Sequence, residues 1–189
     1  MRLILLGSPG CGKGTVAEKL SKKYKVISIS PGELLRKEIK KNSIIGRKIH
    51  KKIAKGDLVP SDLVFNLVKK HISGKKNFIL DGAPRDLWES QLLDRYLKKR
   101  KEQIDLVLFI DVPKKVCVER LHKRNKLIAR EDDRTKIINH RFSVYKKQTL
   151  PVIKKYQNKK VLKRVNGNQS PSKVYRDVVK IVKEFNAKN

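Results

Sequence analysis

The chain reads Gly7-Ser8-Pro9-Gly10-Cys11-Gly12-Lys13-Gly14-Thr15 near its N-terminus, and this stretch decides the fold. It fits the pattern G-x-x-x-x-G-K, with a short apolar segment, Arg2–Leu6, before it and apolar residues at helical spacing after it. Glycines allow successive backbone N–H groups to point at phosphate oxygens, and the following helix adds the positive end of its dipole. The stretch therefore predicts a phosphate-binding loop between a strand and a helix.

The side chains of this loop indicate how it would hold a nucleoside triphosphate. Lys13 supplies a mobile positive charge for the β- and γ-phosphates, and the Thr15 hydroxyl is a candidate ligand of Mg²⁺ or a donor to phosphate. Gly14 lies between them, although the general pattern has Ser or Thr directly after the lysine. Cys11 is expected to act mainly through its backbone N–H. The expected ATP-binding residues of the loop are Gly10, Cys11, Gly12, Lys13, Gly14 and Thr15.

Short apolar segments alternate along the chain with longer segments of helical periodicity. This alternation predicts an α/β fold in which helices flank a parallel sheet. The five expected strands are Arg2–Leu6, Val26–Ser30, Asn77–Asp81, Leu106–Val112 and Val161–Val165.

An insertion is predicted between the second and third strands. About 45 residues lie there, more than one crossover helix requires, and they are interpreted as three short helices broken at Asn42 and Gly56. The third of these helices is expected to begin with Ser61 as its cap and to end at Gly74. The C-terminal helix is expected to begin at Ser170 in the same manner.

The composition limits the class of protein. A chain of 189 residues predicts one compact domain, residues 1–189, and no apolar run is long enough to cross a bilayer. Cys11 and Cys117 have no C-x-x-C spacing, and the four histidines are scattered, so neither a zinc site nor a disulfide framework is expected. A cytoplasmic protein without a membrane segment is the expectation.

The net charge is +30, from 48 Lys and Arg against 18 Asp and Glu. Such an excess predicts attraction to polyanions that weakens as salt is added. The lysines fall on expected helix surfaces throughout the chain, and no aromatic residues are interleaved with them as in proteins that bind single strands. We therefore interpret the charge as a solvated surface with weak, non-specific affinity for polyanions.

The loop variant Gly-x-Pro-Gly-x-Gly-Lys-Gly-Thr resembles the adenylate kinase family, and further matches to that family span nearly the whole chain. The resemblance implies a P-loop kinase fold with a five-stranded parallel sheet. It also implies transfer of the γ-phosphoryl group of ATP to AMP, with Mg²⁺ as the cofactor. Nucleotides are the small-molecule partners that it implies.

The segment Ser30-Pro31-Gly32-Glu33-Leu34-Leu35-Arg36 is similar to a family motif whose arginine holds the α-phosphate of the monophosphate, a role that falls to Arg36. The segment Gly56-Asp57-Leu58-Val59-Pro60 is similar to a turn that lines the acceptor pocket. Residues 30–60 are therefore the expected monophosphate-binding insertion. The implied AMP-binding residues are Pro31, Arg36, Asp57, Leu58, Val59, Gly82, Ala83, Pro84, Arg85, Glu89, Arg130 and Arg141.

The segment Asp81-Gly82-Ala83-Pro84-Arg85 is similar to the family motif D-G-[FY]-P-R, with Ala83 in place of the aromatic residue. Asp81 ends an expected strand, at the sheet edge where α/β folds bind ligands, and could hold Mg²⁺ directly or through water. Arg85 follows on a turn, and its guanidinium can bind two phosphate oxygens at once.

Four arginines after the fourth strand match the spacing of the family's lid. Arg120 and Arg124 are expected one helical turn apart, facing the donor nucleotide, and Arg130 and Arg141 are similar to a pair that closes over both substrates' phosphates. The segment 120–133 is short enough to resemble the family's short lid, which has no zinc. Gln169 follows the last strand in a loop similar to the one that faces the donor adenine. The implied catalytic residues are Lys13, Arg85, Arg124, Arg130 and Arg141.

Two departures from the family leave the acceptor open. Pro31 stands where the family usually has threonine, and Glu89 stands where adenylate kinases have a glutamine that reads adenine. A kinase of UMP, CMP or GMP with the same fold is the first alternative. A nucleic-acid-binding ATPase that uses the net charge of +30 is the second.

Overall fold

A computed structural model describes residues 1–187, and its centre is a sheet of five parallel strands in the order β2-β3-β1-β4-β5. The strands are β1 (Arg2–Leu6), β2 (Ile27–Ile29), β3 (Phe78–Asp81), β4 (Leu106–Asp111) and β5 (Leu162–Asn166). The predicted α/β fold and all five predicted strands are confirmed, with bounds that differ by at most one residue at either end. The register pairs Leu5 of β1 with Asp81 of β3 and with Leu108 of β4.

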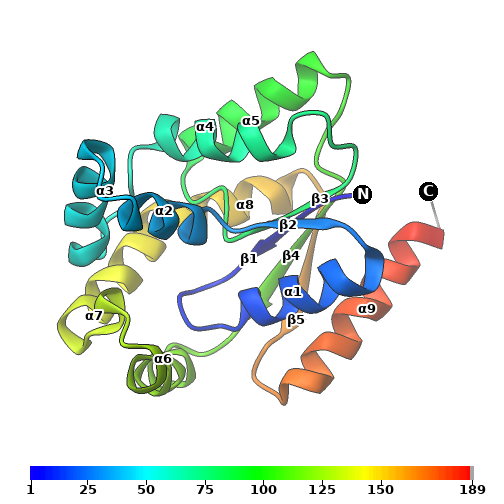
Figure 1. Cartoon of the computed structure of the whole chain (residues 1–189). Coiled ribbons are helices and arrows are strands. Elements are labelled where there is room, and N and C mark those ends of the chain that lie inside the picture. Colours follow the sequence, from blue (N-terminus) through cyan, green and yellow to red (C-terminus); the bar gives the residue numbers. More distant parts are fainter. Residues whose placement is uncertain (188–189) are drawn as a thin grey trace.

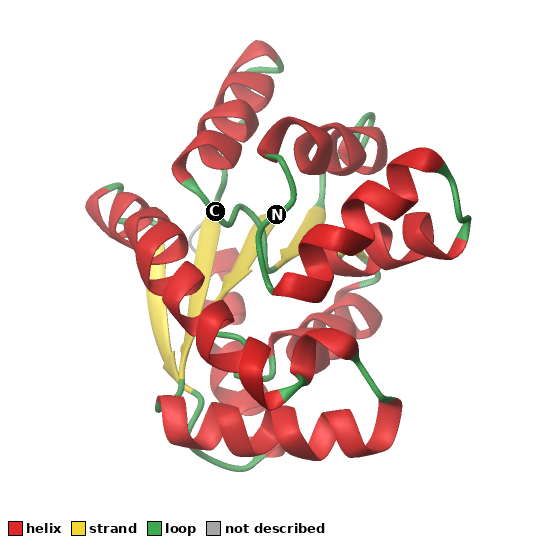
Figure 2. Ribbon diagram, turned by 90° about the vertical axis from the view of Figure 1, so that its left-hand side faces the viewer, coloured by secondary structure: helices red, strands yellow, loops and turns green. Residues whose placement is uncertain are grey.

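Helices cover both faces of the sheet (Figures 1 and 2). On one face lie α1 (Lys13–Tyr24) and α9 (Pro171–Ala187), which share an apolar cluster with β1 and β4. On the other lie α4 (Ser61–Ile72), α5 (Leu87–Lys99) and α8 (Leu150–Asn158). Because side chains of a strand alternate between faces, Leu3 and Leu5 pack on the first side, and Ile4 and Leu6 pack on the second.

The predicted insertion consists of α2 (Pro31–Lys40), α3 (Ile44–Lys55) and then α4, with breaks at the two predicted positions. Asn42 and Gly56 have left-handed backbone angles, φ 51° and φ 80° respectively. A small apolar cluster of its own, Leu35, Ile49, Val59 and Val64, holds these helices together.

The predicted cap of α4 was wrong. Pro60 is the N-cap, and Ser61 is the first helical residue, whose hydroxyl donates instead to Asp86 Oδ2 at 2.7 Å. The helix ends at Ile72, and Gly74 has its left-handed φ of 71° just beyond it. The side chain of Ser61 therefore ties the insertion to the start of α5.

A run of helices follows β4 and returns the chain to β5. It contains α6 (Lys114–Ile128), the 3-10 turn η1 (Glu131–Asp133), α7 (Thr135–Val144) and the π-helix η2 (Tyr145–Thr149), which leads directly into α8. Figure 1 shows α6 and α7 on the same side of the molecule as α2 and α3, beyond the carboxyl ends of the strands. No helix among residues 1–187 is long and apolar enough to cross a membrane.

Candidate active site

A cavity of about 710 Å³ opens at the carboxyl ends of the strands, between the phosphate-binding loop, the insertion and α6. This is the place where ligands bind in open α/β sheets. The cavity is lined by every predicted site residue except Pro84, which is buried beside it. These are Gly10, Cys11, Gly12, Lys13, Gly14, Thr15, Pro31, Arg36, Asp57, Leu58, Val59, Asp81, Gly82, Ala83, Arg85, Glu89, Arg120, Arg124, Arg130, Arg141 and Gln169.

The phosphate-binding loop is organised around Lys13, the first residue of α1. Its Nζ donates to the carbonyls of Gly7 and Ser8 at 2.8 and 2.9 Å, and it lies 3.4 Å from Cys11 Sγ. Gly10 has φ 82°, and a Cβ there would lie 2.5 Å from the carbonyl oxygen of Cys117, so no other residue fits. The loop therefore places its lysine at the N-terminus of α1, where the helix dipole stabilises an anion.

Asp81 lies at the carboxyl end of β3, next to the loop. A Cβ on Gly14 would lie 3.5 Å from Asp81 Oδ2, so the start of α1 passes the carboxylate at van der Waals distance. Burial raises the pKa of Asp81, and the charges of Lys13 and Arg85 act in the opposite direction. A partly buried carboxylate and the Thr15 hydroxyl on the same cavity provide oxygen ligands, the kind that Mg²⁺ prefers.

Arg85 is fixed by its backbone on both sides. Its N–H donates to Glu89 Oε2 at 2.7 Å, and its carbonyl accepts from Thr149 Oγ1 at 2.8 Å. The side-chain Nε donates to the carbonyl of Gly82, which leaves the terminal nitrogens toward the insertion, where a Cβ on Gly32 would lie 3.3 Å from Arg85 Nη2. The guanidinium is thus oriented before any substrate binds.

Arg36 and Arg130 differ from the other arginines of the cavity. Among residues 1–187 their guanidinium groups donate no hydrogen bond and form no ion pair within 4 Å. Burial lowers the pKa of Arg36, and the nearby charge of Arg130 lowers it further. Burial also lowers the pKa of Arg130, as does the charge of Arg124. Two partly buried cations that repel each other across a cavity provide a site for an anion.

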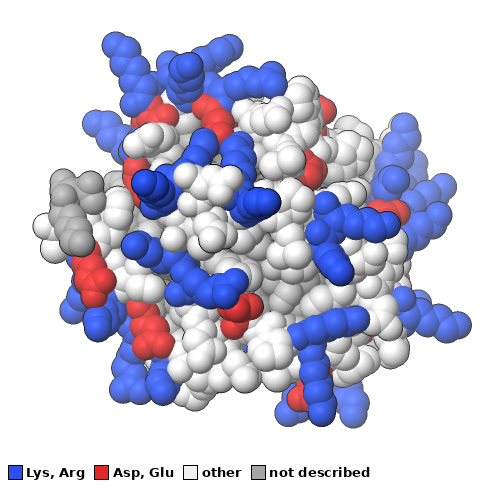
Figure 3. All heavy atoms as spheres, turned by 180° about the vertical axis from the view of Figure 1, so that it is seen from behind, with Lys and Arg blue, Asp and Glu red and all other residues white. Residues whose placement is uncertain are grey.

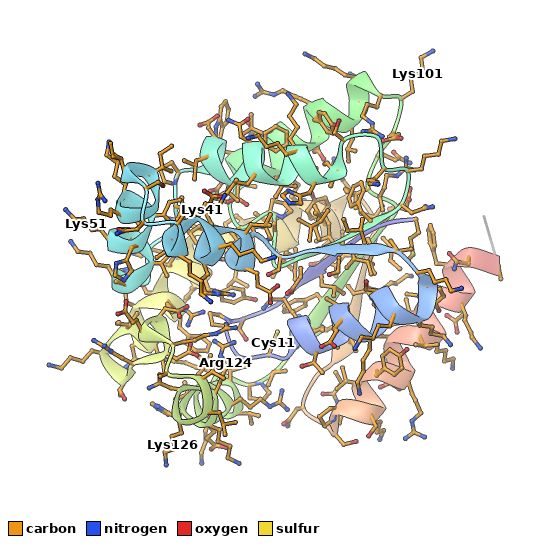
Figure 4. The ribbon with its side chains drawn as sticks, in the orientation of Figure 1. Cys11, Lys41, Lys51, Lys101, Arg124 and Lys126 are labelled. Carbon is orange, nitrogen blue, oxygen red and sulfur yellow. The ribbon has the colours of Figure 1, made fainter. Side chains whose placement is uncertain are left out.

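Arg124 and Arg141 share the carboxylate of Asp133, whose side chain is fully buried. Arg124 donates through Nε and Nη2 at 2.6 and 2.8 Å, and Arg141 donates through Nη1 at 2.6 Å. Figure 4 shows Arg124 on the side of α6 that faces Cys11, whereas Lys126 points away from the protein. Asp133 therefore fixes two predicted catalytic arginines at once.

At the end of the cavity next to the loop after β5, two side chains donate hydrogen bonds to backbone carbonyls. Arg120 donates to the carbonyls of Cys11 and Gly167 at 3.4 and 3.2 Å, and so joins α6 to the loop after β5. Gln169 Nε2 donates to the carbonyl of Asn166 and to Asp177 Oδ2. The amide of Gln169 is thus engaged locally, although the residue lines the cavity as predicted.

Comparison with known proteins agrees with this geometry. The model of the family described as adenylate kinase matches residues 5–161. The chain is 36% identical to an adenylate kinase of Thermotoga neapolitana, with 95% of this chain and 96% of the relative covered. It is 34% identical to adenylate kinases of Clostridium perfringens, which it covers to 98%, and of Lachnospira eligens, which it covers in full, with 96% of this chain aligned in each case.

The chain belongs to the adenylate kinase family. The predictions of family, fold and phosphotransferase class are thereby confirmed. The alignment with the Thermotoga neapolitana adenylate kinase spans 211 positions, more than the 189 residues of this chain, so that relative contains segments that are absent here.

Several residues of this adenylate kinase fold were not found from sequence. Asp133 falls within the expected lid segment 120–133 but has no expected role there, and Thr149 has none either. Two histidine–carboxylate pairs also went unrecognised: His50 of α3 and Glu131 of η1 form a 2.7 Å hydrogen bond, and His140 of α7 and Asp57 form another of 2.7 Å. Both pairs join the insertion to the segment that follows α6. The available signal for Asp133 was an acidic run, Glu131-Asp132-Asp133, in a strongly basic chain.

The charge outside the cavity is spread over the surface. Figure 3 shows lysine and arginine side chains projecting around the whole outline of the rear face, with acidic side chains among them. In Figure 4, Lys51 and Lys101 likewise point outward, one from α3 and the other from the loop after α5. This dispersed arrangement fits the interpretation of a solvated surface.

Proposed function

We propose that this member of the adenylate kinase family transfers the γ-phosphoryl group of ATP to AMP and so forms two molecules of ADP. The observation that carries the proposal is that the unpaired guanidinium groups of Arg36 and Arg130 line the same cavity as the phosphate-binding loop. One nucleotide would occupy the loop end, and the free cations at the opposite end would bind the phosphate group of a second nucleotide. A reaction between two nucleotides explains both the phosphate-binding loop and the cations opposite it.

The donor would bind at the loop end. Backbone N–H groups of residues 10–15 and the Lys13 ammonium would hold its phosphates, and Arg120 and Arg124 would contact the nucleotide from α6. In the structure Lys13 donates to two loop carbonyls, and these bonds would be exchanged for bonds to phosphate oxygens. The Lys13 ammonium would thus donate to oxygen atoms both before and after ATP binds.

The acceptor would bind at the insertion end. Arg36 and Arg85 would hold the phosphate of AMP, and Gly32 leaves both guanidinium groups room, since its Cβ would lie within 3.5 Å of each. The turn of Asp57, Leu58 and Val59 and the segment Gly82-Ala83-Pro84 would surround the nucleoside. Pro84 would support this segment without touching the nucleoside, because it is buried and does not line the cavity.

Residues 120–133 would form a short lid, and residues 30–60 the acceptor flap. Phosphoryl transfer demands positioning and charge stabilisation more than covalent chemistry, and Arg130 and Arg141 would approach the transferred group when both parts close. Closure would also exclude water that could hydrolyse ATP. Asp81 and Thr15 would hold Mg²⁺, which when bound neutralises charge on the donor phosphates.

A coupled assay of ADP formation, with ATP, Mg²⁺ and a panel of AMP, GMP, CMP and UMP, tests the proposal. We expect AMP to be the best acceptor at about pH 6. Arg36→Ala should lower kcat/KM for AMP about 10- to 100-fold, the scale of lost charge-assisted hydrogen bonds, whereas Arg47→Ala on the exposed side of α3 should leave it within about twofold. Equal effects of the two variants, or a better acceptor than AMP at about pH 6, would contradict the assignment.

The nucleic-acid-binding alternative is tested separately, by filter binding to RNA across a salt series. Weak binding that disappears at moderate salt is expected from the dispersed charge. Tight binding that persists at high salt would instead point to a dedicated nucleic-acid function.

A further inference from the structure

Glu89 has two carboxyl oxygens with different surroundings. The residue lies in the first turn of α5 and is only 4% exposed. Its N–H donates to Asp86 Oδ1 at 2.7 Å, and its Oε2 accepts from the N–H of Arg85 at 2.7 Å, an arrangement similar to a capping box. Because an N–H must be met by a lone pair, Oε2 is always an acceptor.

The second oxygen, Oε1, has no hydrogen-bond partner among the described residues. It is also absent from the polar side-chain atoms of these residues that are both fully buried and without a partner, so it keeps some access to the cavity. Glu89 lines the cavity at the acceptor end, together with Arg36 and Val59. Oε1 is therefore the atom of this nearly buried carboxyl that remains for a ligand. A proton on the carboxyl resides on Oε1, since Oε2 accepts from Arg85. Oε1 then donates when Glu89 is protonated and accepts when it is ionised.

We propose that Oε1 of Glu89 meets the N1 position of the acceptor purine, and that the proton on Glu89 selects the base. The inference rests on the proposed function, in which the acceptor nucleoside occupies this end of the cavity. Adenine N1 carries a lone pair and requires a donor, which the protonated acid supplies. Guanine N1 carries a hydrogen and requires an acceptor, which the carboxylate supplies. A glutamine presents a permanent donor, so a glutamate here converts a fixed adenine preference into one that depends on pH.

The surroundings of Glu89 place this titration near neutrality. Burial raises its pKa to about 7, against the opposing hydrogen bond and charge of Arg85 and with a small contribution from Asp86. On the helices that pack against α5, Asp62 of α4 accepts from Trp88, and Lys155 of α8 donates to Ser90 and pairs with Asp94. The insertion also places Glu33, Arg36 and Asp57 on the wall of the same cavity. Below about pH 7 the protonated form dominates and favours AMP, and above it the ionised form favours GMP.

The test compares wild type with Glu89→Gln at about pH 6 and about pH 8. Glutamine keeps the acceptor for Arg85 N–H and fixes a donor toward the cavity, so the variant should fold normally. We expect the ratio of AMP kcat/KM between wild type and variant to fall about tenfold over this range, because the protonated fraction of Glu89 falls about tenfold. Ionisation of the AMP phosphate affects both proteins alike and cancels in the ratio. Glu184→Gln, an exposed matched change on α9, should follow wild type.

Two further readouts complete the experiment. In wild type the GMP to AMP ratio of kcat/KM should rise by up to about a hundredfold from pH 6 to pH 8, and in Glu89→Gln it should stay constant. Calorimetry in buffers of different ionisation enthalpy should show more proton uptake on binding AMP than on binding GMP at about pH 8, only in wild type. A wild-type to variant ratio that does not change with pH would overturn the inference while leaving the kinase intact. Absence of turnover with every monophosphate would overturn the proposed function instead.

Discussion

Asp133 and Arg124 form a two-point ion pair, in which Oδ2 accepts from Nε at 2.6 Å and Oδ1 accepts from Nη2 at 2.8 Å. The carboxylate is fully buried, whereas the Arg124 side chain is one-third exposed and reaches the cavity. The buried Asp133 carboxylate therefore holds the Arg124 guanidinium from the side that faces away from the cavity. The acidic member of the pair cannot contact substrate, and the basic member can.

Asp133→Asn should lower both stability and turnover. The amide leaves Arg124 without a counter-charge, whereas Arg141 keeps its ion pair with Asp132 at 3.1 Å. Breaking one side of a buried ion pair costs about 3–5 kcal/mol, and less here because both arginines keep some contact with solvent. We expect a lower urea midpoint and a loss of at least about tenfold in kcat. Asp94→Asn, which removes a partly exposed carboxylate paired with two lysines, should change stability by less than about 1 kcal/mol.

The same carboxylate should make unfolding depend on pH. Burial alone would raise the pKa of Asp133, but the hydrogen bonds and charges of Arg124 and Arg141 outweigh it, and the pKa lies below the ordinary value. A folded-state pKa below the unfolded one stabilises the protein above the unfolded pKa of about 3.9, and this contribution is lost as the pH falls through the folded pKa. The stability difference between wild type and Asp133→Asn should thus be constant between about pH 5 and 7 and shrink in more acidic buffer. A difference that grows on acidification would contradict the ion-pair account.

Lys13→Met should abolish turnover without unfolding the protein. The ammonium is the only side-chain cation that the loop itself places at the donor phosphates, and loss of such electrostatic stabilisation costs about 10²- to 10³-fold or more in kcat. Because Nζ also donates to the carbonyls of Gly7 and Ser8, we expect a small drop in Tm as well. Lys22→Met, on the exposed part of the same helix, is the matched control and should retain wild-type kcat. Wild-type turnover by a folded Lys13→Met protein would exclude the proposed role.

A bisubstrate mimic, two adenosines joined by five phosphates, should protect residues 30–60 and 120–133 from hydrogen exchange. Arg36 and Arg130 gain partners only when phosphate is present at the acceptor end, so ligand binding should favour the closed arrangement. The pairs His50–Glu131 and His140–Asp57 already join these parts, and exposed pairs of this kind contribute at most about 1 kcal/mol each. Protection without ligand should therefore be partial, and ATP alone should increase it less than the mimic does. Identical exchange in these segments with and without the mimic would rule out closure.

The parts of this molecule that sequence predicted are those encoded by local pattern. The loop residues 7–15, the strands and the breaks at Asn42 and Gly56 depend on neighbours in the chain, where glycine conformation and side-chain periodicity act directly. The cap at Ser61 was predicted wrongly because a partner distant in the chain, Asp86, takes its hydroxyl. Local propensity could not register that competition.

The connections that sequence could not supply are long-range. The bond between Thr149 and the carbonyl of Arg85 joins residues 64 positions apart, and the His50–Glu131 pair joins residues 81 apart. For Glu89 the sequence identified the position but not the burial of its carboxyl. Its burial, which raises the pKa to about 7, is a property of tertiary packing alone.

The dispersed lysines have a kinetic consequence. A net charge of +30 surrounds a cavity for two polyanions, and the resulting field extends about 8 Å into physiological salt before it is screened. Nucleotides are drawn toward such a surface from any direction, so the frequency of productive encounters falls as ionic strength rises. Inside the cavity the arginines act at hydrogen-bond range, where mobile ions hardly intervene. Salt should therefore weaken capture of substrate far more than it slows the chemical step.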